Sequence, residues 1–167
     1  CIRDSLGYDH SAVYVGAVLK HPDPDKMPKE FSQRDEIWNV NAETFFVTFN
    51  TYNDDLNFFG FQITSAGTVG DVYSSGSIDS DDFLYDTVFD AKTHISSDSW
   101  SVEMAIPYSA IRFPEKEEQL WGLNFGRKIQ SLDETFVWSP VNVNELEYHE
   151  SNGCLLYTSP SPRDGTK

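Results

Sequence analysis

Oxygen-rich side chains lie on both sides of one predicted strand of this 167-residue chain and could coordinate a cation. Asp35 precedes the alternating residues 45–49, and Asn53, Asp54 and Asp55 follow them. A hard cation such as Ca²⁺ takes about six to eight oxygen ligands, which loops at strand ends can supply. The spacing differs from that of the helix–loop–helix calcium loop. The residues therefore predict either a calcium site at Asp35, Asp54 and Asp55 or a hydrated turn.

Two aromatic side chains lie in polar segments, where strand alternation does not dictate their burial. Trp38 precedes an Asn-Val-Asn sequence, and Tyr148 lies among three glutamates and a histidine. An aromatic ring can cover the apolar C–H face of a sugar while neighbouring amides and carboxylates bind its hydroxyls. Both residues are therefore candidates for carbohydrate binding, with ordinary packing as the alternative for each.

Catalytic motifs are missing from the sequence. The four histidines lack metal-ligand spacing, and there is neither a G-x-S-x-G elbow nor a phosphate-binding glycine loop. With 27 Asp and Glu residues, a pair at glycosidase separation would arise by chance, so carboxylate pairing carries little weight. No residue is predicted to be catalytic, and whether the whole protein is an enzyme stays open.

The charge balance excludes some partners. The chain has 12 Lys and Arg residues against 27 Asp and Glu, a formal charge of −15. Binding nucleic acid requires a surplus of basic residues on one face, so this sequence predicts no nucleic-acid partner. No apolar run approaches the roughly 18 to 20 residues of a spanning helix, which predicts no direct membrane insertion of this segment.

Hydrophobic residues alternate with a period of two in five segments, which predicts strands at 13–19, 45–49, 58–63, 100–106 and 121–125. Turn-forming sequences separate them, and the one helical candidate is a short turn at 108–112. The pattern is typical of an all-β fold, an antiparallel β-sandwich of jelly-roll or immunoglobulin-like type. Residues 58–63 carry aromatics on both faces, so this strand is either central and buried or an aromatic platform for a ligand.

Four sequence blocks, between about residues 8 and 138, resemble the carbohydrate family 9 binding domain-like modules. They stand in the expected order as Tyr-Asp-His-Ser-Ala-Val-Tyr-Val-Gly at 8–16, the Gln-Arg-Asp to Tyr-Asn-Asp block at 33–54, Trp-Ser-Val-Glu-Met-Ala-Ile-Pro-Tyr-Ser-Ala-Ile-Arg-Phe at 100–113 and Trp-Gly-Leu-Asn-Phe-Gly-Arg at 121–127. The resemblance is closest to the branch found ahead of an uncharacterised outer-membrane β-barrel in Gram-negative bacteria.

The resemblance implies a jelly-roll-like sandwich that holds a terminal sugar between two aromatic rings and carries structural calcium. Trp38 lies close to the expected position of one ring, and Tyr148 lies in the loop expected to supply the second. Arg34 and Asn53, within the resembling blocks, complete the predicted carbohydrate-binding set. Glu43 and Asn50 replace the two aspartates that are usual in the strand motif.

The two ends of the chain depart from the family pattern. The resemblance places the module at 1–153, truncated at the N-terminus because the usual opening strand is missing before Cys1. Residues 154–167 resemble adapter read-through joined to an environmental gene fragment, which predicts a non-native tail. A Ser/Pro-rich linker is the alternative.

The sequence thus predicts a non-catalytic carbohydrate-binding module of a larger protein that acts in glycan binding or glycoside-hydrolase-associated breakdown. The alternative is an interaction or gating domain of an outer-membrane β-barrel that has lost sugar binding, with the barrel C-terminal to it in the parent chain. Both hypotheses predict a periplasmic, outer-membrane-associated or extracellular location.

Overall fold

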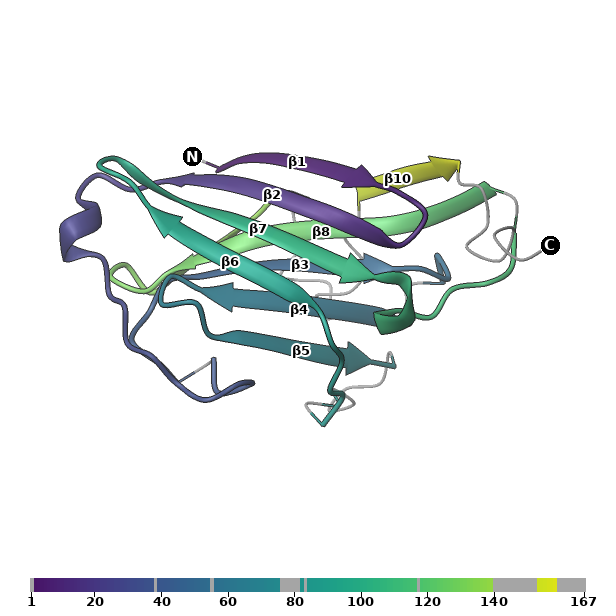
Figure 1. Cartoon of the computed structure of the whole chain (residues 1–167), viewed down its shortest axis with the longest axis horizontal. Coiled ribbons are helices and arrows are strands. Elements are labelled where there is room, and N and C mark those ends of the chain that lie inside the picture. Colours follow the sequence, from purple (N-terminus) through teal and green to yellow (C-terminus); the bar gives the residue numbers. More distant parts are fainter. Residues whose placement is uncertain are drawn as a thin grey trace, which may run out of the picture.

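The computed structural model describes residues 2–37, 39–54, 56–75, 82, 84–116, 118–139 and 153–158. Their regular secondary structure is almost entirely β-strand (Figure 1). The strands are β1 (Ile2–Tyr8), β2 (Ala12–Lys20), β3 (Thr44–Asn50), β4 (Phe58–Thr64), β5 (Val69–Ser74), β6 (Asp90–Ile95), β7 (Ser99–Pro107), β8 (Glu118–Ile129), β9 (Glu134–Val137) and β10 (Gly153–Thr158). Two short 3₁₀ turns, η1 (Pro24–Lys26) and η2 (Tyr108–Ala110), accompany them.

The strands form two antiparallel sheets that pack face to face. One sheet has the order β1-β2-β7-β6, and the other has the order β10-β8-β3-β4-β5, with β9 also paired to β8 (Figure 1). The predicted all-β sandwich is confirmed, and all five predicted strands are present. The predicted helical turn at 108–112 is present as the shorter η2. Among the described residues, no helix combines the length and the apolar character needed to cross a membrane.

Aromatic side chains on alternating strand positions fill the space between the sheets. Phe45, Phe49 and Phe61 are fully buried on the inner face of the larger sheet, and Trp100 meets them from the smaller one. Phe49 contacts Phe61 edge to face, with ring centroids 6.2 Å apart. Burying one such side chain stabilises the fold by about 1.5–3 kcal/mol. The aromatic richness of the sequence is therefore largely accounted for by the core.

The double-faced strand β4 is buried along its whole length, so the burial prediction for residues 58–63 is confirmed. Its inner face joins the core, and on its outer face Gln62 is also buried. Next to Gln62 on β5, Gly70 lies directly beneath the side chain of Ile37. The loop that contains Ile37 therefore covers part of the outer face of the larger sheet.

The backbone of β10 crosses the predicted module boundary at 153/154. Residues 153–158 pair antiparallel with residues 118–123 of β8. Continuity of a sheet says nothing about the origin of a sequence, so the non-native tail at 154–167 stays a prediction.

Asp9 fixes the tight turn between β1 and β2. Its Oδ1 accepts hydrogen bonds from the amide of Ser11 at 2.7 Å and the amide of Ala12 at 3.0 Å, and its Oδ2 accepts one from the Tyr14 hydroxyl at 2.9 Å. The Ser11 hydroxyl donates to Oδ1 as well. These donors favour the ionised carboxylate and hold the pKa of Asp9 well below its ordinary value of 3.8.

Acid is therefore expected to weaken this turn. Because the pKa of Asp9 is lower in the folded than in the unfolded state, its stabilisation is present above the unfolded value of 3.8 and is lost as pH falls through the folded one. We expect Asp9→Asn to be less stable than the wild type near neutral pH, and the gap to close in acid. Urea unfolding of the wild type and the variant, from neutral pH down into acid, measures this difference in stability. Asp4→Asn on β1 is the control. A gap independent of pH would contradict the assignment.

Gly126 of β8 lies where no side chain fits. A Cβ there would collide with the carbonyl oxygen of Phe136 and lie 2.7 Å from the Phe46 ring. Gly126→Ala is therefore expected to lower the free energy of unfolding by about 1–3 kcal/mol, measured by chemical denaturation. Gly16→Ala on β2 is the matched control, since nothing lies within 4 Å of its Cβ position. Equal effects of the two substitutions would refute the steric explanation.

Candidate functional site

The segment between η1 and β3, residues 28–37 and 39–42, follows the edge of β5 (Figure 1) and is called the site loop below. The amide of Ser32 donates to the Thr68 hydroxyl at 3.2 Å, and the amide of Asp35 donates to the carbonyl of Val69 at 3.1 Å. A bridge between Lys29 and Ala42 closes its base. The site loop is thus closed at its base and held to the sheet at its middle.

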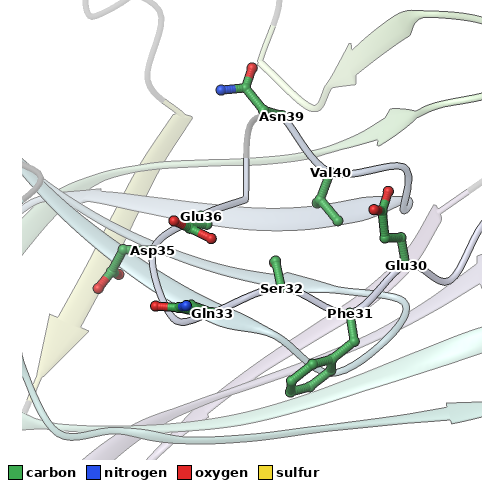
Figure 2. A pocket seen from close by; sticks show the side chains of 8 residues that line it. All are labelled: Glu30, Phe31, Ser32, Gln33, Asp35, Glu36, Asn39 and Val40. Carbon is green, nitrogen blue, oxygen red and sulfur yellow. The ribbon is translucent and has the colours of Figure 1, made fainter.

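Residues of the site loop line a hollow of about 730 Å³ that is open to solvent, called the loop hollow below. Figure 2 shows the eight side chains that line it: Glu30, Phe31, Ser32, Gln33, Asp35, Glu36, Asn39 and Val40. Phe31 is 76% exposed, and the Ser32 hydroxyl oxygen is shielded from solvent and has no hydrogen-bond partner. Amides, carboxylates and a free hydroxyl beside an exposed ring are suited to binding a polyol that also has an apolar face.

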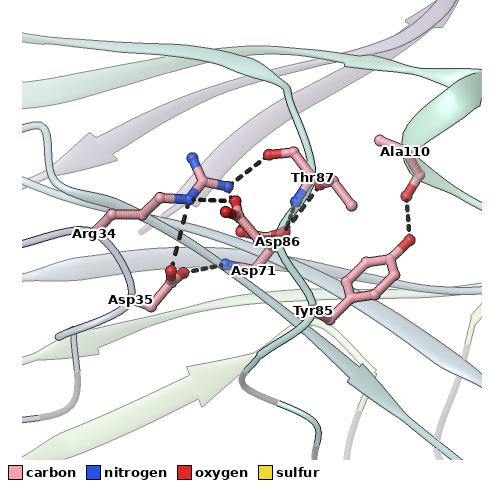
Figure 3. Close-up of polar contacts among 7 residues, drawn as sticks. All are labelled: Arg34, Asp35, Asp71, Tyr85, Asp86, Thr87 and Ala110. Atoms are coloured by element: carbon pink, nitrogen blue, oxygen red, sulfur yellow. Dashed lines mark hydrogen bonds and ion pairs between the residues drawn. The ribbon is translucent and has the colours of Figure 1, made fainter.

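The Arg34 guanidinium does not line the loop hollow and is held by a cluster of acidic and backbone groups (Figure 3). Its Nη2 lies 2.5 Å from Oδ1 of Asp71 and donates to the carbonyl of Thr87 at 2.7 Å. Its Nε lies 3.1 Å from Asp86 and 3.6 Å from Asp35. We call these five residues the Arg34 cluster. It ties the site loop to β5 and to the segment before β6.

Asp71 is the buried centre of that cluster. Its side chain is fully buried and accepts hydrogen bonds on Oδ2 from the amide of Thr87 at 2.7 Å and its hydroxyl at 2.9 Å. Burial raises the pKa of the Asp71 carboxyl, although Thr87 and Arg34 act in the opposite direction. Burial of a carboxylate is tolerated here because every contact named is with a donor or a cation.

The turn at Asp35 depends on a glycine in the neighbouring strand. Asp35 has a φ of 67°, and its Oδ1 accepts a hydrogen bond from the amide of Asp71 at 3.1 Å. A Cβ on Gly70 would lie 2.5 Å from Cδ1 of Ile37 and 3.2 Å from Oδ1 of Asp35. At the close approach of the site loop to β5, a side chain at position 70 would therefore displace the Ile37 side chain.

The structure separates the predicted carbohydrate-binding residues. Trp38 and Tyr148 lie outside the described residues. Arg34 belongs to the Arg34 cluster, beside the first residues of β5, which pair with the end of β4. Asn53, with a φ of 51°, lies instead in the turn that precedes the start of β4. Arg34 and Asn53 therefore do not share one site.

The predicted calcium ligands are also separated. Asp55 lies outside the described residues, and Asp35 is engaged as described above. Asp54 accepts hydrogen bonds from the amides of Leu56 and Asn57, both at 3.0 Å. Burial opposes its ionisation, but these donors and the Asn57 side chain lower the pKa of Asp54 overall. In the part of the chain that the structure describes, no three His, Cys, Asp or Glu side chains form a metal-binding group. Asp35 and Asp54 thus do not fit one cation, and calcium binding stays a prediction.

A buried ion pair within the larger sheet, not anticipated from the sequence, also makes hydrogen bonds to the smaller sheet. Oε2 of Glu43 accepts hydrogen bonds from Nη2 of Arg127 and, at 3.2 Å, from Nε1 of Trp100. Nη1 of Arg127 donates to the carbonyl of Lys20 at 2.8 Å, and Nε2 of His21 lies 3.1 Å from Oε1 of Glu43. The sequence did contain one signal for the pair. Arg127 continues the alternation of the core residues of β8, so its side chain points inward. Because the pair is almost completely buried, it serves the fold rather than a ligand.

The fold is a two-sheet antiparallel β-sandwich with the loop hollow beside its edge strand β5. Neither a model of a protein family nor a curated protein matches the chain. Among solved structures, a candidate carbohydrate-binding protein from Bacteroides uniformis ATCC 8492 is similar at 15% identity, with a TM-score of 0.71, over 93% of this chain and 77% of that one.

A second similar structure is more specific. It is a carbohydrate binding module of family 9 from Caldicellulosiruptor kristjanssonii in complex with glucose, with 14% identity and a TM-score of 0.59, over 92% of this chain and 74% of that one. The chain therefore has the fold of the family 9 carbohydrate binding modules, as the sequence resemblance predicted.

Proposed function

We propose that this protein is a non-catalytic carbohydrate-binding module and that the loop hollow receives the sugar. The observation that carries the proposal is the composition of the loop hollow, in which amides, carboxylates and a hydroxyl surround space beside an exposed Phe31 ring. The fold supports it, because one similar structure is a family 9 module that holds glucose.

The chemistry divides between two kinds of contact. Gln33 and Asn39 each offer an amide that donates and accepts. These groups match the adjacent hydroxyls of a pyranose ring. The Phe31 ring covers the C–H face, and Trp38, on the same loop, is the second aromatic residue assigned to this contact.

Calorimetric titration with a panel of mono- and oligosaccharides tests the proposal. We expect heat of binding with at least one glycan for the wild type, and loss of most of that heat with Trp38→Ala or Phe31→Ala. Tyr14→Ala, an exposed ring on β2 of the other sheet, is the control and is expected to bind like the wild type. Absence of heat across a broad panel would refute the proposal.

We also propose, from the sequence blocks, that the module belongs to a larger periplasmic, outer-membrane-associated or extracellular protein that takes part in glycan breakdown. The alternative is an interaction or gating domain of an outer-membrane barrel. It is favoured by the second ring position, where the sequence carries Tyr148 or Leu146 and no tryptophan. The complete reading frame distinguishes the two, because a hydrolase domain supports the first and a barrel of alternating strands supports the second.

A further inference from the structure

We propose that the loop hollow selects its glycan by charge, accepting neutral sugars, preferring amino sugars and rejecting uronic acids. This inference rests on the proposed function, because it names the class of sugar for the same site. It follows from the ionisable groups that line the loop hollow and from the contacts of Arg34, which lies next to the lining residue Asp35.

Every ionisable side chain that lines the loop hollow is acidic. Among the eight lining residues are three carboxylates, Glu30, Asp35 and Glu36, and no Lys, Arg or His. The Glu36 carboxylate has no hydrogen bond or ion pair with another described residue. Oε2 of Glu30 accepts a hydrogen bond from the amide of Asn41 at 2.8 Å, which positions its charge without neutralising it.

Arg34 lies between these acids in the sequence, but its guanidinium is already engaged with other groups of the protein. Its guanidinium lies within ion-pair distance of Asp35, Asp71 and Asp86. It also donates to the carbonyl of Thr87 and lies over the Phe89 ring, 5.5 Å from its centroid. A guanidinium with this many partners cannot turn toward a ligand carboxylate in the loop hollow without breaking contacts to a buried acid.

Neutral groups in the loop hollow supply the contacts that all three sugar classes share. Gln33 and Asn39 bind hydroxyls whatever the charge of the ligand. Around them, Glu30, Glu36 and the Arg34 cluster carry five negative charges, against which the site loop has two basic residues, Lys29 and Arg34. A ligand carboxylate is repelled by this excess and a ligand ammonium is attracted, and both effects weaken with salt.

Three tetrasaccharides with the same β-1,4 linkage provide the test, built from glucose, glucosamine or glucuronic acid. At low ionic strength we expect the glucuronic acid tetramer to bind about tenfold more weakly than the glucose tetramer and the glucosamine tetramer several-fold more tightly. Glu36→Gln is expected to reduce both differences. Glu103→Gln changes the net charge equally, but on the exposed side of β7, and is expected to leave them unchanged.

Each outcome is decisive. Equal affinity for the three tetramers would overturn the charge selection and leave the proposed function standing. The same effect of Glu36→Gln and Glu103→Gln would overturn the assignment to the loop hollow, because it would show attraction to the whole acidic surface. Failure of all three tetramers, together with failure of the wider panel, would overturn both the inference and the proposed function.

Discussion

Replacing Arg127 with methionine is expected to lower the free energy of unfolding by about 3–5 kcal/mol, because it leaves the Glu43 carboxylate buried without its cation. The Glu43 side chain is fully buried and that of Arg127 is 2% exposed. Water therefore cannot replace the lost contact. Methionine retains much of the packing volume of the arginine stem, so the loss reports the charge rather than a cavity.

Two contacts of Glu43 remain after that loss. Trp100 donates a single hydrogen bond to Oε2, at 3.2 Å. Nε2 of His21 lies 3.1 Å from Oε1, and Nδ1 of the same ring accepts a hydrogen bond from the amide of Asp23 at 3.1 Å. The buried carboxylate would thus lose the guanidinium and keep the contacts with Trp100 and His21.

Equilibrium denaturation of three variants measures the effect. Lys128→Met is the control from the next position of β8, where the lysine is 25% exposed and its partner Asp133 is 87% exposed, and we expect a change below about 1 kcal/mol. The double variant Glu43→Gln with Arg127→Met removes both charges and is expected to regain part of the stability. A single Arg127→Met variant as stable as the wild type would show that the buried pair does not stabilise the sandwich.

Asp71→Ala is expected to produce the second large effect, a loss of about 1–3 kcal/mol in stability together with weaker glycan binding. The substitution removes the acceptor for Thr87 and the strongest anchor of Arg34. Arg34 is 34% exposed and can be partly rehydrated, which keeps the loss below that expected for Arg127. Because the Arg34 cluster fixes the site loop, the loop hollow should lose its shape before the sandwich unfolds.

Thermal unfolding and glycan titration of two further variants separate these contributions. Asp86→Ala removes a carboxylate from the same guanidinium, but this one is 74% exposed, so we expect a change below about 1 kcal/mol. Asp71→Asn is expected to be more stable than Asp71→Ala, because it retains an acceptor for Thr87 and because burial raises the pKa of Asp71. Equal losses for Asp71→Ala and Asp86→Ala would contradict the central role of the buried carboxylate.

The sequence predicted most of the sandwich because its strongest signal, alternating large apolar residues, is the signal of core strands. Strands whose side chains are only partly buried gave no such pattern. β6 alternates between exposed and half-buried residues such as Lys92 and Thr93, and β9 is mostly exposed. β1 is an edge strand with charged residues such as Arg3 and Asp4. These strands form through pairing with neighbours rather than through their own hydrophobicity.

The candidate site was predicted less completely, because its residues depend on contacts distant in sequence. The loop around Trp38 was predicted as a binding segment, and the loop hollow lies in that loop. The roles of Arg34 and Asp35 could not be predicted, because their partner Asp71 lies 36 or 37 residues away on β5. Likewise, Glu43 and Arg127 are 84 residues apart, and only the folded sandwich brings them together.

The central claim, that the loop hollow binds carbohydrate, is tested most directly by a ¹H–¹⁵N correlation titration with the β-1,4-linked glucose tetramer. We predict progressive shift changes in the amides of residues 30–37 and 39–40, with little change in β2 and β7 on the far sheet, and their loss in Phe31→Ala. Shift changes confined to other surfaces would contradict the claim. So would the absence of shift changes at high tetramer concentration, if the other glycans of the panel also fail to bind.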